Sequence, residues 1–241
     1  MRLRDSLLIS LAALVLGAAP AAAARNVPVL RPLTVPTRPL QAGAHASDPG
    51  TCMLGVTGPA ASVVSYVIPP DDQYYTLLDP EDCACAGHGG YTPTAAHIVV
   101  EFGYAYDTPV RVGVVRADLS DPECPKPVPG DYLVPPLDYA LAAPAGGVYD
   151  VEMPLAAGAC LTETAFLEIT FTDWGFSYEV PSLVLTASCE PCRSYNYYPG
   201  DDYDLCTFGF PGNPIMYAAA NCCTSVPALH GTWGRLKSIY R

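Results

Sequence analysis

The sequence has little positive charge. It contains 12 Lys and Arg residues against 24 Asp and Glu residues, a formal net charge of −12 at pH 7. Because nucleic acids and anionic membranes are bound by clustered Lys and Arg, this balance argues against both as partners. An acidic surface is compatible with cations, polyols, sugars or a basic protein, and it also serves solubility alone.

The sequence also lacks the motifs of common enzyme classes. It has no GxSxG, HExxH, Walker or GxGxxG motif. The four histidines, His45, His88, His97 and His230, are far apart, and His97 is expected to begin a strand. Carboxylates cannot be paired across a site from sequence alone. The sequence therefore favours a protein without catalytic activity and leaves a secreted hydrolase as the enzymatic alternative.

Long apolar runs are missing except at the N-terminus. Arg2 and Arg4 precede an apolar stretch at 6–17, and the alanine-rich residues 18–24 offer an A-x-A cleavage site. This order predicts a secretory signal peptide over residues 1–24. The run is too short to span a bilayer and no second run of about 20 apolar residues follows, so we expect no transmembrane segment after signal removal. The predicted location is secreted or extracytoplasmic, in the periplasm or at the cell surface.

Proline and glycine are abundant, with 26 and 20 residues, which argues against long helices. Residues 25–50 are rich in proline and show neither helical nor strand periodicity, so they are predicted to form an extended linker. A folded domain is expected over 51–229. The tail at 230–241 is predicted to include a short amphipathic helix.

Short segments in which apolar and polar residues alternate recur through the expected domain. This pattern, bounded by Pro and Gly, is typical of half-buried antiparallel strands. The segments are 61–68, 97–102, 110–115, 149–155, 167–171, 182–187 and 215–218. A hairpin turn is expected at 107–109, between the second and third of them. Seven or eight such strands predict an all-β fold, an antiparallel β-sandwich resembling a jelly roll.

In an exported chain, disulfide bonds are the expected state of the ten cysteines. Five lie in the first 160 residues and five from position 189 onward, so full pairing requires at least one bridge between the two halves. Neighbours such as 83 and 85, or 222 and 223, are not expected to bridge each other because the geometry is strained. The cysteines are Cys52, Cys83, Cys85, Cys124, Cys160, Cys189, Cys192, Cys206, Cys222 and Cys223.

A metal or redox role for the C-terminal cysteines is the weaker interpretation. Cys189 and Cys192, followed by Cys206 and the pair at 222–223, have some similarity to a zinc site, but a second CxxC is missing. No thioredoxin-like βαβ pattern surrounds the CxxC motif, so the sequence gives redox catalysis little support.

The stretch 194–204 interleaves tyrosines with Asn and Asp. Aromatic rings pack on apolar faces of sugars, and amides and carboxylates bind hydroxyl groups, so this stretch is a candidate contact surface for glycan or protein. The alternative is that the tyrosines pack on the sandwich, within a loop held by its cysteines. The candidate ligand-binding residues are Tyr195, Tyr197, Tyr198 and Tyr203, together with Trp174.

The densest acidic cluster is the candidate site for a structural calcium ion. Calcium takes six to eight oxygen ligands, and Asp201, Asp202 and Asp204 supply several carboxylates within one turn. Asp71 and Asp72 form a smaller cluster. The spacing of an EF-hand is missing, so a solvated acidic turn is the competing interpretation, and no other cofactor is expected.

Four segments carry a resemblance to a known group of proteins. They are GVYDVEMPL at 147–155, FLEITFTD at 166–173, CRSYNYY at 192–198 and PGNPIMYAAANCC at 211–223. With the closing TWGRLKSIYR, they resemble uncharacterised secreted bacterial β-sandwich proteins that have a C-terminal PGNxxMYxxxxCC motif. The resemblance implies a secreted, jelly-roll-like sandwich and assigns no functional residues.

The leading functional prediction is a secreted, non-enzymatic binding or adhesion module for an extracellular glycan or protein. A structural subunit of an extracellular assembly is the second, because a free proline-rich arm can add a strand to a neighbour's sheet. A secreted hydrolase is the third.

Overall fold

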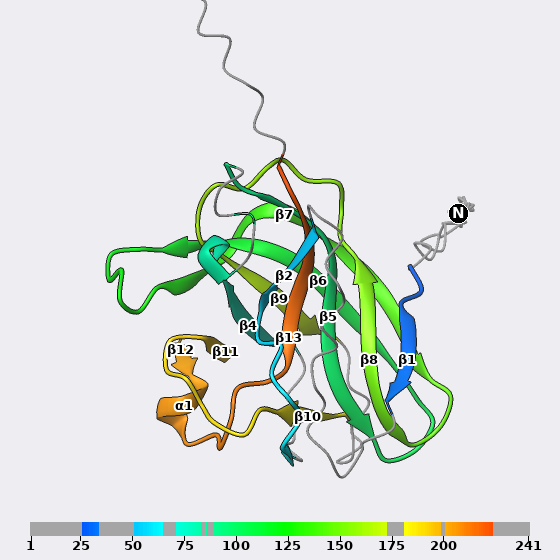
Figure 1. The fold of residues 1–241 in the computed structure, drawn as a ribbon. Coiled ribbons are helices and arrows are strands. Elements are labelled where there is room, and N and C mark those ends of the chain that lie inside the picture. Colours follow the sequence, from blue (N-terminus) through cyan, green and yellow to red (C-terminus); the bar gives the residue numbers. More distant parts are fainter. Residues whose placement is uncertain are drawn as a thin grey trace, which may run out of the picture.

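The computed structural model describes residues 26–33, 51–64, 71–82, 85, 89–172, 181–198 and 201–223, with the backbone alone at 64, 198 and 201. These residues form two packed antiparallel sheets, with a single four-residue helix (Figure 1). The predicted all-β antiparallel sandwich is confirmed. The predicted signal peptide, the C-terminal tail and most of the linker lie outside the described residues. No helix of the described part is long and apolar enough to cross a membrane.

The first sheet has seven strands. Its main path is β1-β8-β5-β10-β3, and β13 pairs with both β5 and β2. The strands are β1 (Val29–Leu33), β2 (Thr51–Gly55), β3 (Ser62–Val64), β5 (Tyr91–Phe102), β8 (Gly147–Pro154), β10 (Ser182–Leu185) and β13 (Met216–Cys222).

The second sheet has six strands in the order β12-β11-β4-β9-β6-β7. They are β4 (Asp72–Leu78), β6 (Tyr106–Asp118), β7 (Lys126–Ala143), β9 (Ala165–Phe171), β11 (Ser194–Tyr198) and β12 (Asp201–Asp204). A short 3-10 helix, η1 (Pro80–Asp82), follows β4, and α1 (Leu205–Phe208) follows β12. From β4 to β10 the chain changes sheet at every connection except the β6–β7 hairpin.

The main core lies between the two sheets. Alternate residues of each strand point into it, as the period of two requires. On β9, for example, Leu167, Ile169 and Phe171 belong to this core and are fully buried. A second, smaller apolar cluster lies on the outer face of the six-stranded sheet and includes Tyr75, Phe166 and Tyr195.

The structure corrects the strand predictions in three places. The six-stranded sheet includes β4, β7, β11 and β12, which the alternation of the sequence did not indicate. The hairpin turn expected at 107–109 is wrong, because these residues belong to β6, and the chain turns between Phe102 and Tyr106. The described strands number 13, where seven or eight were expected.

A further correction concerns the N-terminal linker, part of which is a strand. Val29–Leu33 pairs with β8, and the preceding Asn26 bridges to Tyr139 of β7. The Asn26 amide donates to Asp138 O at 3.2 Å, and Ala140 N donates to Asn26 O at 2.9 Å. Residues 29–33 therefore form the edge strand of the seven-stranded sheet, and Asn26 contacts the edge strand β7 of the other sheet, which closes one side of the sandwich.

Disulfide bonds link distant parts of the described chain. The bridges are Cys85–Cys222, Cys124–Cys192, Cys160–Cys223 and Cys189–Cys206. Cys52 is also disulfide-bonded, and no cysteine of the described residues is free. Three of the four bridges connect the two halves of the chain, and the adjacent Cys222 and Cys223 take different partners, as predicted. Bonds of this kind fit an extracellular protein.

The PGN segment of the resembling motif has a structural role. A side chain at Gly212 would collide with Thr186 O, since its Cβ would lie 2.0 Å from that atom. Asn213 is buried, accepts a hydrogen bond from Glu190 N at 2.6 Å and donates to Glu190 O and Ser194 Oγ. The motif thus joins the segment that leads into β13 to the start of β11.

Candidate functional site

The stretch predicted to bind a ligand is an antiparallel hairpin of β11 and β12 at the edge of the six-stranded sheet. Its tyrosines are divided between the two faces. Tyr195 and Tyr197 point to the outer face, in the same direction as Tyr75 of β4. Tyr203 pairs with Asn196 and so points the other way; it is 38 % exposed and lies beside Phe208. The predicted aromatic surface is therefore not continuous.

Tyr195 is not an accessible contact residue. It is 1 % exposed, and its ring packs edge-on against Phe166 with centroids 5.6 Å apart. The loop between β6 and β7 contributes to its surroundings, because the Cys124–Cys192 bridge brings Cys124 Sγ to 3.2 Å from the Tyr195 hydroxyl. Burial, followed by the nearby Asp204 charge, raises the pKa of Tyr195 to about 12. The alternative interpretation, that these tyrosines pack on the sandwich, applies to Tyr195.

Tyr197 belongs to a row of side chains that crosses the whole outer face. The strand registers place one residue from each of the six strands opposite the next. In order from β12 to β7 they are Asp202, Tyr197, Gln73, Thr170, Arg111 and Asp138. We call this set the cross-strand row. It faces away from the core, because the neighbouring positions Tyr74, Ile169 and Val112 are core residues.

Polar groups along the cross-strand row are linked to one another and to the strands beneath. The Arg111 guanidinium donates to Asp138 at 2.9 Å, and both side chains are about half exposed. The Tyr75 hydroxyl donates to Gln73 Oε1. Thr170 Oγ1 donates to Glu168 Oε1 at 3.2 Å. At a strand spacing of about 4.8 Å, the row is about 24 Å long, which suits an extended ligand.

Glu168 is buried directly beside the cross-strand row. It is 1 % exposed, and its Oε1 accepts from Tyr132 at 2.8 Å as well as from Thr170. The Tyr132 ring contacts Gly113, where a Cβ atom would lie only 3.0 Å from it. Glu168 Oε2 is buried without a hydrogen-bond partner among the described residues. Because this oxygen is buried and the Tyr75 hydroxyl also interacts with Glu168, an added donor can reach it only if the side chains around it move.

Burial controls the ionisation of this cluster. Loss of solvent raises the pKa of Glu168, and hydrogen bonds from Tyr132 and Thr170 oppose the rise. The pKa values of Tyr75 and Tyr132 are raised, first by burial and then through the nearby Glu168. The tyrosines therefore stay protonated and act as hydrogen-bond donors at neutral pH.

Asp204 is not a free surface carboxylate, because both of its oxygens accept hydrogen bonds from the backbone. It is the N-cap of α1, where Oδ1 accepts from Cys206 N at 2.7 Å and Thr207 N at 3.3 Å. Oδ2 accepts from Cys192 N at 2.6 Å. Asp202 takes part in the cross-strand row, and the side chain of Asp201 lies outside the described atoms. The calcium site stays a prediction.

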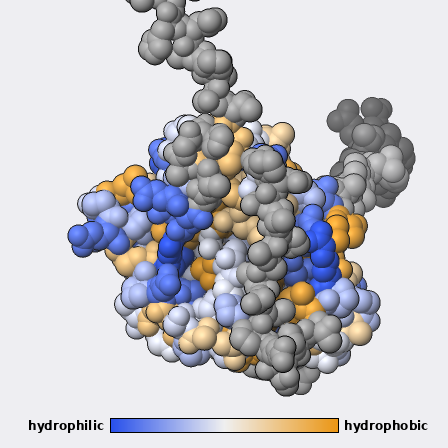
Figure 2. Space-filling model, in the orientation of Figure 1, coloured by the Kyte–Doolittle hydropathy of each residue, from blue (hydrophilic) through white to orange (hydrophobic). Residues whose placement is uncertain are grey.

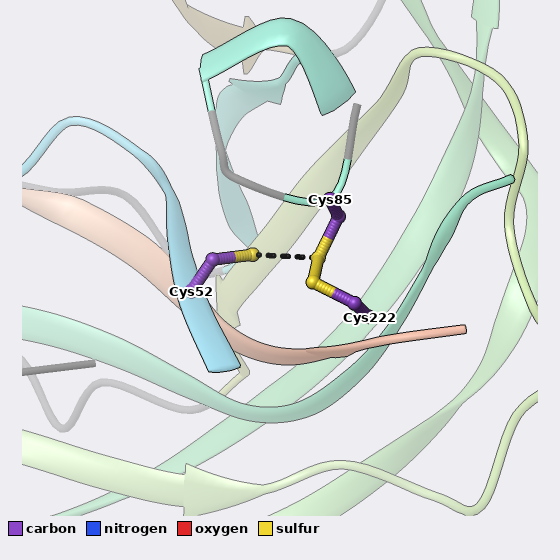
Figure 3. A group of neighbouring side chains, drawn as sticks. All are labelled: Cys52, Cys85 and Cys222. Carbon is purple, nitrogen blue, oxygen red and sulfur yellow. Dashed lines mark hydrogen bonds between the residues drawn. A yellow bond between two sulfur atoms is a disulfide. The ribbon is translucent and has the colours of Figure 1, made fainter. Parts of the chain in front are cut away.

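The zinc interpretation of the C-terminal cysteines is wrong for this structure. Cys189, Cys192, Cys206, Cys222 and Cys223 are all in disulfides, so none offers a thiolate. Cys52, Cys85 and Cys222 do lie close together (Figure 3). Cys52 Sγ is 3.4 Å from Cys85 Sγ, but each of the three sulfurs is bonded to another sulfur. The cluster joins β2 to the end of β13.

Other candidates fall outside what the structure describes. Trp174, the side chain of Tyr198, and His45, His88 and His230 belong to this group. His97 lies within β5, where it was expected to begin a strand.

Sequence reasoning did not single out Gln73, Arg111, Asp138 or Glu168 as binding residues. The alternation on β9 marked Glu168 and Thr170 as polar positions, but register across strands was needed to place them beside Tyr197. No protein-family model, curated protein or solved structure matches this chain.

Proposed function

We propose that this protein is an exported binding module that holds an extended glycan along the cross-strand row. The supporting observation is the register that lines up six side chains from six strands on one outer face. A chain of sugars offers hydroxyl groups at regular intervals, so a linear row of donors and acceptors matches it better than a single point would.

The chemistry of the row fits a sugar chain. Tyr197 is partly exposed and packs at its base against the outer apolar cluster, so its ring is a firm platform for the C–H face of a sugar. Gln73 offers groups that donate and accept, and Arg111 offers further donors. Thr170 is 3 % exposed and donates to Glu168, so it holds that carboxylate in place beneath the row. The carboxylates of Asp202 and Asp138 at the two ends accept from hydroxyls.

Glu168 supports the proposal, because a hydrogen bond from a ligand to its buried Oε2 would lower the free energy of the complex. An unpartnered buried acceptor costs about 1–3 kcal/mol, and a ligand hydroxyl that reaches it removes part of that cost. Thr170, which donates to the other oxygen of Glu168, is itself a member of the row. Glycan binding is thereby expected to reduce the free-energy cost of burying the Glu168 carboxylate.

Affinity electrophoresis of the chain without residues 1–24, in gels containing soluble xylan, mixed-linkage glucan or mannan, tests the proposal. Tyr197→Ala should weaken retardation at least tenfold in apparent Kd, because the ring platform is lost. Tyr203→Ala is the matched control, since Tyr203 is on the same hairpin but on the other face, and should bind like wild type. Equal losses in both variants, or no retardation of wild type by any polysaccharide, would overturn the proposal.

Export is part of the proposal. The disulfides support it, and so does the order of basic, apolar and small residues at the N-terminus. Mass determination of the protein recovered outside the cell should show a mature N-terminus near residue 25. The assembly alternative has less support, because residues 29–33 of the expected free arm pair with β8 of the same chain.

A further inference from the structure

The outer face of the other sheet contains a second arrangement of polar side chains. His97, Asp150 and Tyr217 come from β5, β8 and β13, which are neighbours in the seven-stranded sheet. His97 Nδ1 lies 3.1 Å from Asp150 Oδ1, and the Tyr217 hydroxyl donates to Asp150 Oδ2 at 3.1 Å. The rings of His97 and Tyr217 are stacked, with centroids 4.5 Å apart and planes 7° from parallel. The imidazole is thus fixed in position and in orientation.

A pocket of about 320 Å³ lies beside this histidine. Its polar walls are Arg31, Glu152, His97, Tyr217 and Asn221. Figure 2 views this face and shows pale surface over β13 and, where β8 and β1 lie, a strongly hydrophilic patch beside apolar surface. The volume is at the lower end of the range for ligand pockets, about 300–1,000 Å³, and suits a small ligand.

The polar groups of the pocket favour a neutral ligand with several hydroxyl groups. Arg31 is paired with Glu152, so their charges balance. Asp150 is satisfied by His97 and Tyr217, and its hold on Nδ1 leaves Nε2 of His97 as the ring nitrogen for a ligand. Asn221 can donate and accept at once. The pocket therefore offers both donors and acceptors, which matches adjacent hydroxyls.

The base of the pocket is apolar and made of small or unbranched side chains. Ala95, Ala219 and Met53 share the outer face on β5, β13 and β2, where the registers place them in one row. Small side chains leave room for a flat ring to approach the sheet. A pyranose has this combination of a C–H face and a rim of hydroxyls.

We propose that this pocket is a second binding site, which takes a single neutral sugar unit or a short saccharide end. The disulfide cluster of Figure 3 supports its shape, because Cys52 lines the pocket and Cys222 directly follows Asn221. The site is independent of the cross-strand row, which lies on the opposite face of the sandwich.

Ligand-observed NMR and calorimetric titration with the methyl glycosides of glucose, galactose, mannose and N-acetylglucosamine test the site. At least one should bind wild type saturably. Ala219→Leu fills the pocket from an outer-face position and should weaken this binding at least tenfold. Asn221→Ala, at an exposed rim position, should weaken it several-fold and tests the site without changing the pocket floor.

Tyr197→Ala is the control for the other face and should leave glycoside binding unchanged. Conversely, Ala219→Leu should leave polysaccharide retardation by the cross-strand row unchanged. No saturable binding of any of the four glycosides, or binding that Ala219→Leu and Asn221→Ala both leave intact, would overturn the second site. Failure of polysaccharide binding alone would overturn the proposed function and not this inference.

Discussion

The two outer faces of the sandwich each bury a carboxylate beside a tyrosine, but the two carboxylates differ in how completely they are hydrogen-bonded. On the seven-stranded sheet, both oxygens of Asp150 have partners, His97 and Tyr217. On the six-stranded sheet, Glu168 has two donors on Oε1 and none among the described residues on Oε2. A fully paired carboxylate stabilises and orients its neighbours, whereas a half-paired one costs stability, part of which a donor that reached it would restore.

The comparison separates two kinds of site. The satisfied Asp150 fixes a histidine at the edge of a pocket, so we expect little rearrangement when a small ligand enters. The unsatisfied Glu168 lies under a shallow, extended row, where a ligand hydroxyl improves the protein's own hydrogen bonding. Two polar residues that alternate with apolar ones in the same way in the sequence can therefore have different roles on the outer face of a sheet.

Removing the disulfide that supports each outer face should have the largest effect on the free energy of unfolding. The paired substitution Cys85→Ser with Cys222→Ser opens a bridge between residues 137 apart, which corresponds to about 5 kcal/mol. It should also weaken glycoside binding, since the end of β13 is then held by the Cys160–Cys223 bridge alone. Cys124→Ser with Cys192→Ser, 68 residues apart, should cost about 4 kcal/mol and expose Tyr195. Denaturant unfolding and tyrosine accessibility measure both, and identical effects on the two faces would contradict the separation.

Neutralising the two carboxylates should give effects of different size. Asp150→Asn forces a new arrangement on both His97 and Tyr217 and should lower the unfolding free energy by about 2 kcal/mol at pH 7. Glu168→Gln keeps an acceptor for Tyr132 and removes a buried charge, so it should change stability by less than about 1 kcal/mol at pH 7. Because the folded-state pKa of Glu168 is raised, the wild type loses stability as pH rises through that pKa, and the variant should not. Equal destabilisation by both variants would contradict the proposed difference between Asp150 and Glu168.

Asp72 adds a third carboxylate, buried on the inner side of the six-stranded sheet. It accepts from Asn196 at 2.6 Å and from Tyr74 at 2.8 Å, yet burial raises its pKa to about 6. Since the pKa is 3.8 in the unfolded reference, the wild type should lose stability, by about 3 kcal/mol, as pH rises from below 4 to above 6. Asp72→Asn should flatten this part of the pH profile in thermal unfolding. An unchanged profile would show that Asp72 titrates normally.

The sequence predicted the strands that alternate in polarity and missed those that do not. On β8 and β9 the alternation was visible and the strands lie where expected. The strand β4 is buried on both faces except at Gln73, so its sequence shows no clear period. In β7, prolines masked the strand, although an edge position tolerates them because the missing N–H need not join a ladder.

The candidate sites were only partly predictable for a related reason. Tyr197 and Asp202 could be selected from the local aromatic and acidic composition, and they do lie next to each other. Their partners Gln73, Thr170 and Arg111 come from three other strands, and only the register brings them together. Composition also selected Tyr195, which the Cys124–Cys192 loop helps to bury; disulfide pairing cannot be deduced from spacing.

Backbone amide NMR of the mature protein, titrated with a xylan- or glucan-derived hexasaccharide that retards it in the gels, shows whether the cross-strand row is where the glycan binds. The account predicts that the largest shift changes fall on the cross-strand row, at Tyr197, Gln73, Thr170 and Arg111, with Tyr203 unaffected. Shift changes that avoid this row and cluster elsewhere, or that involve Tyr203 as strongly as Tyr197, would contradict it.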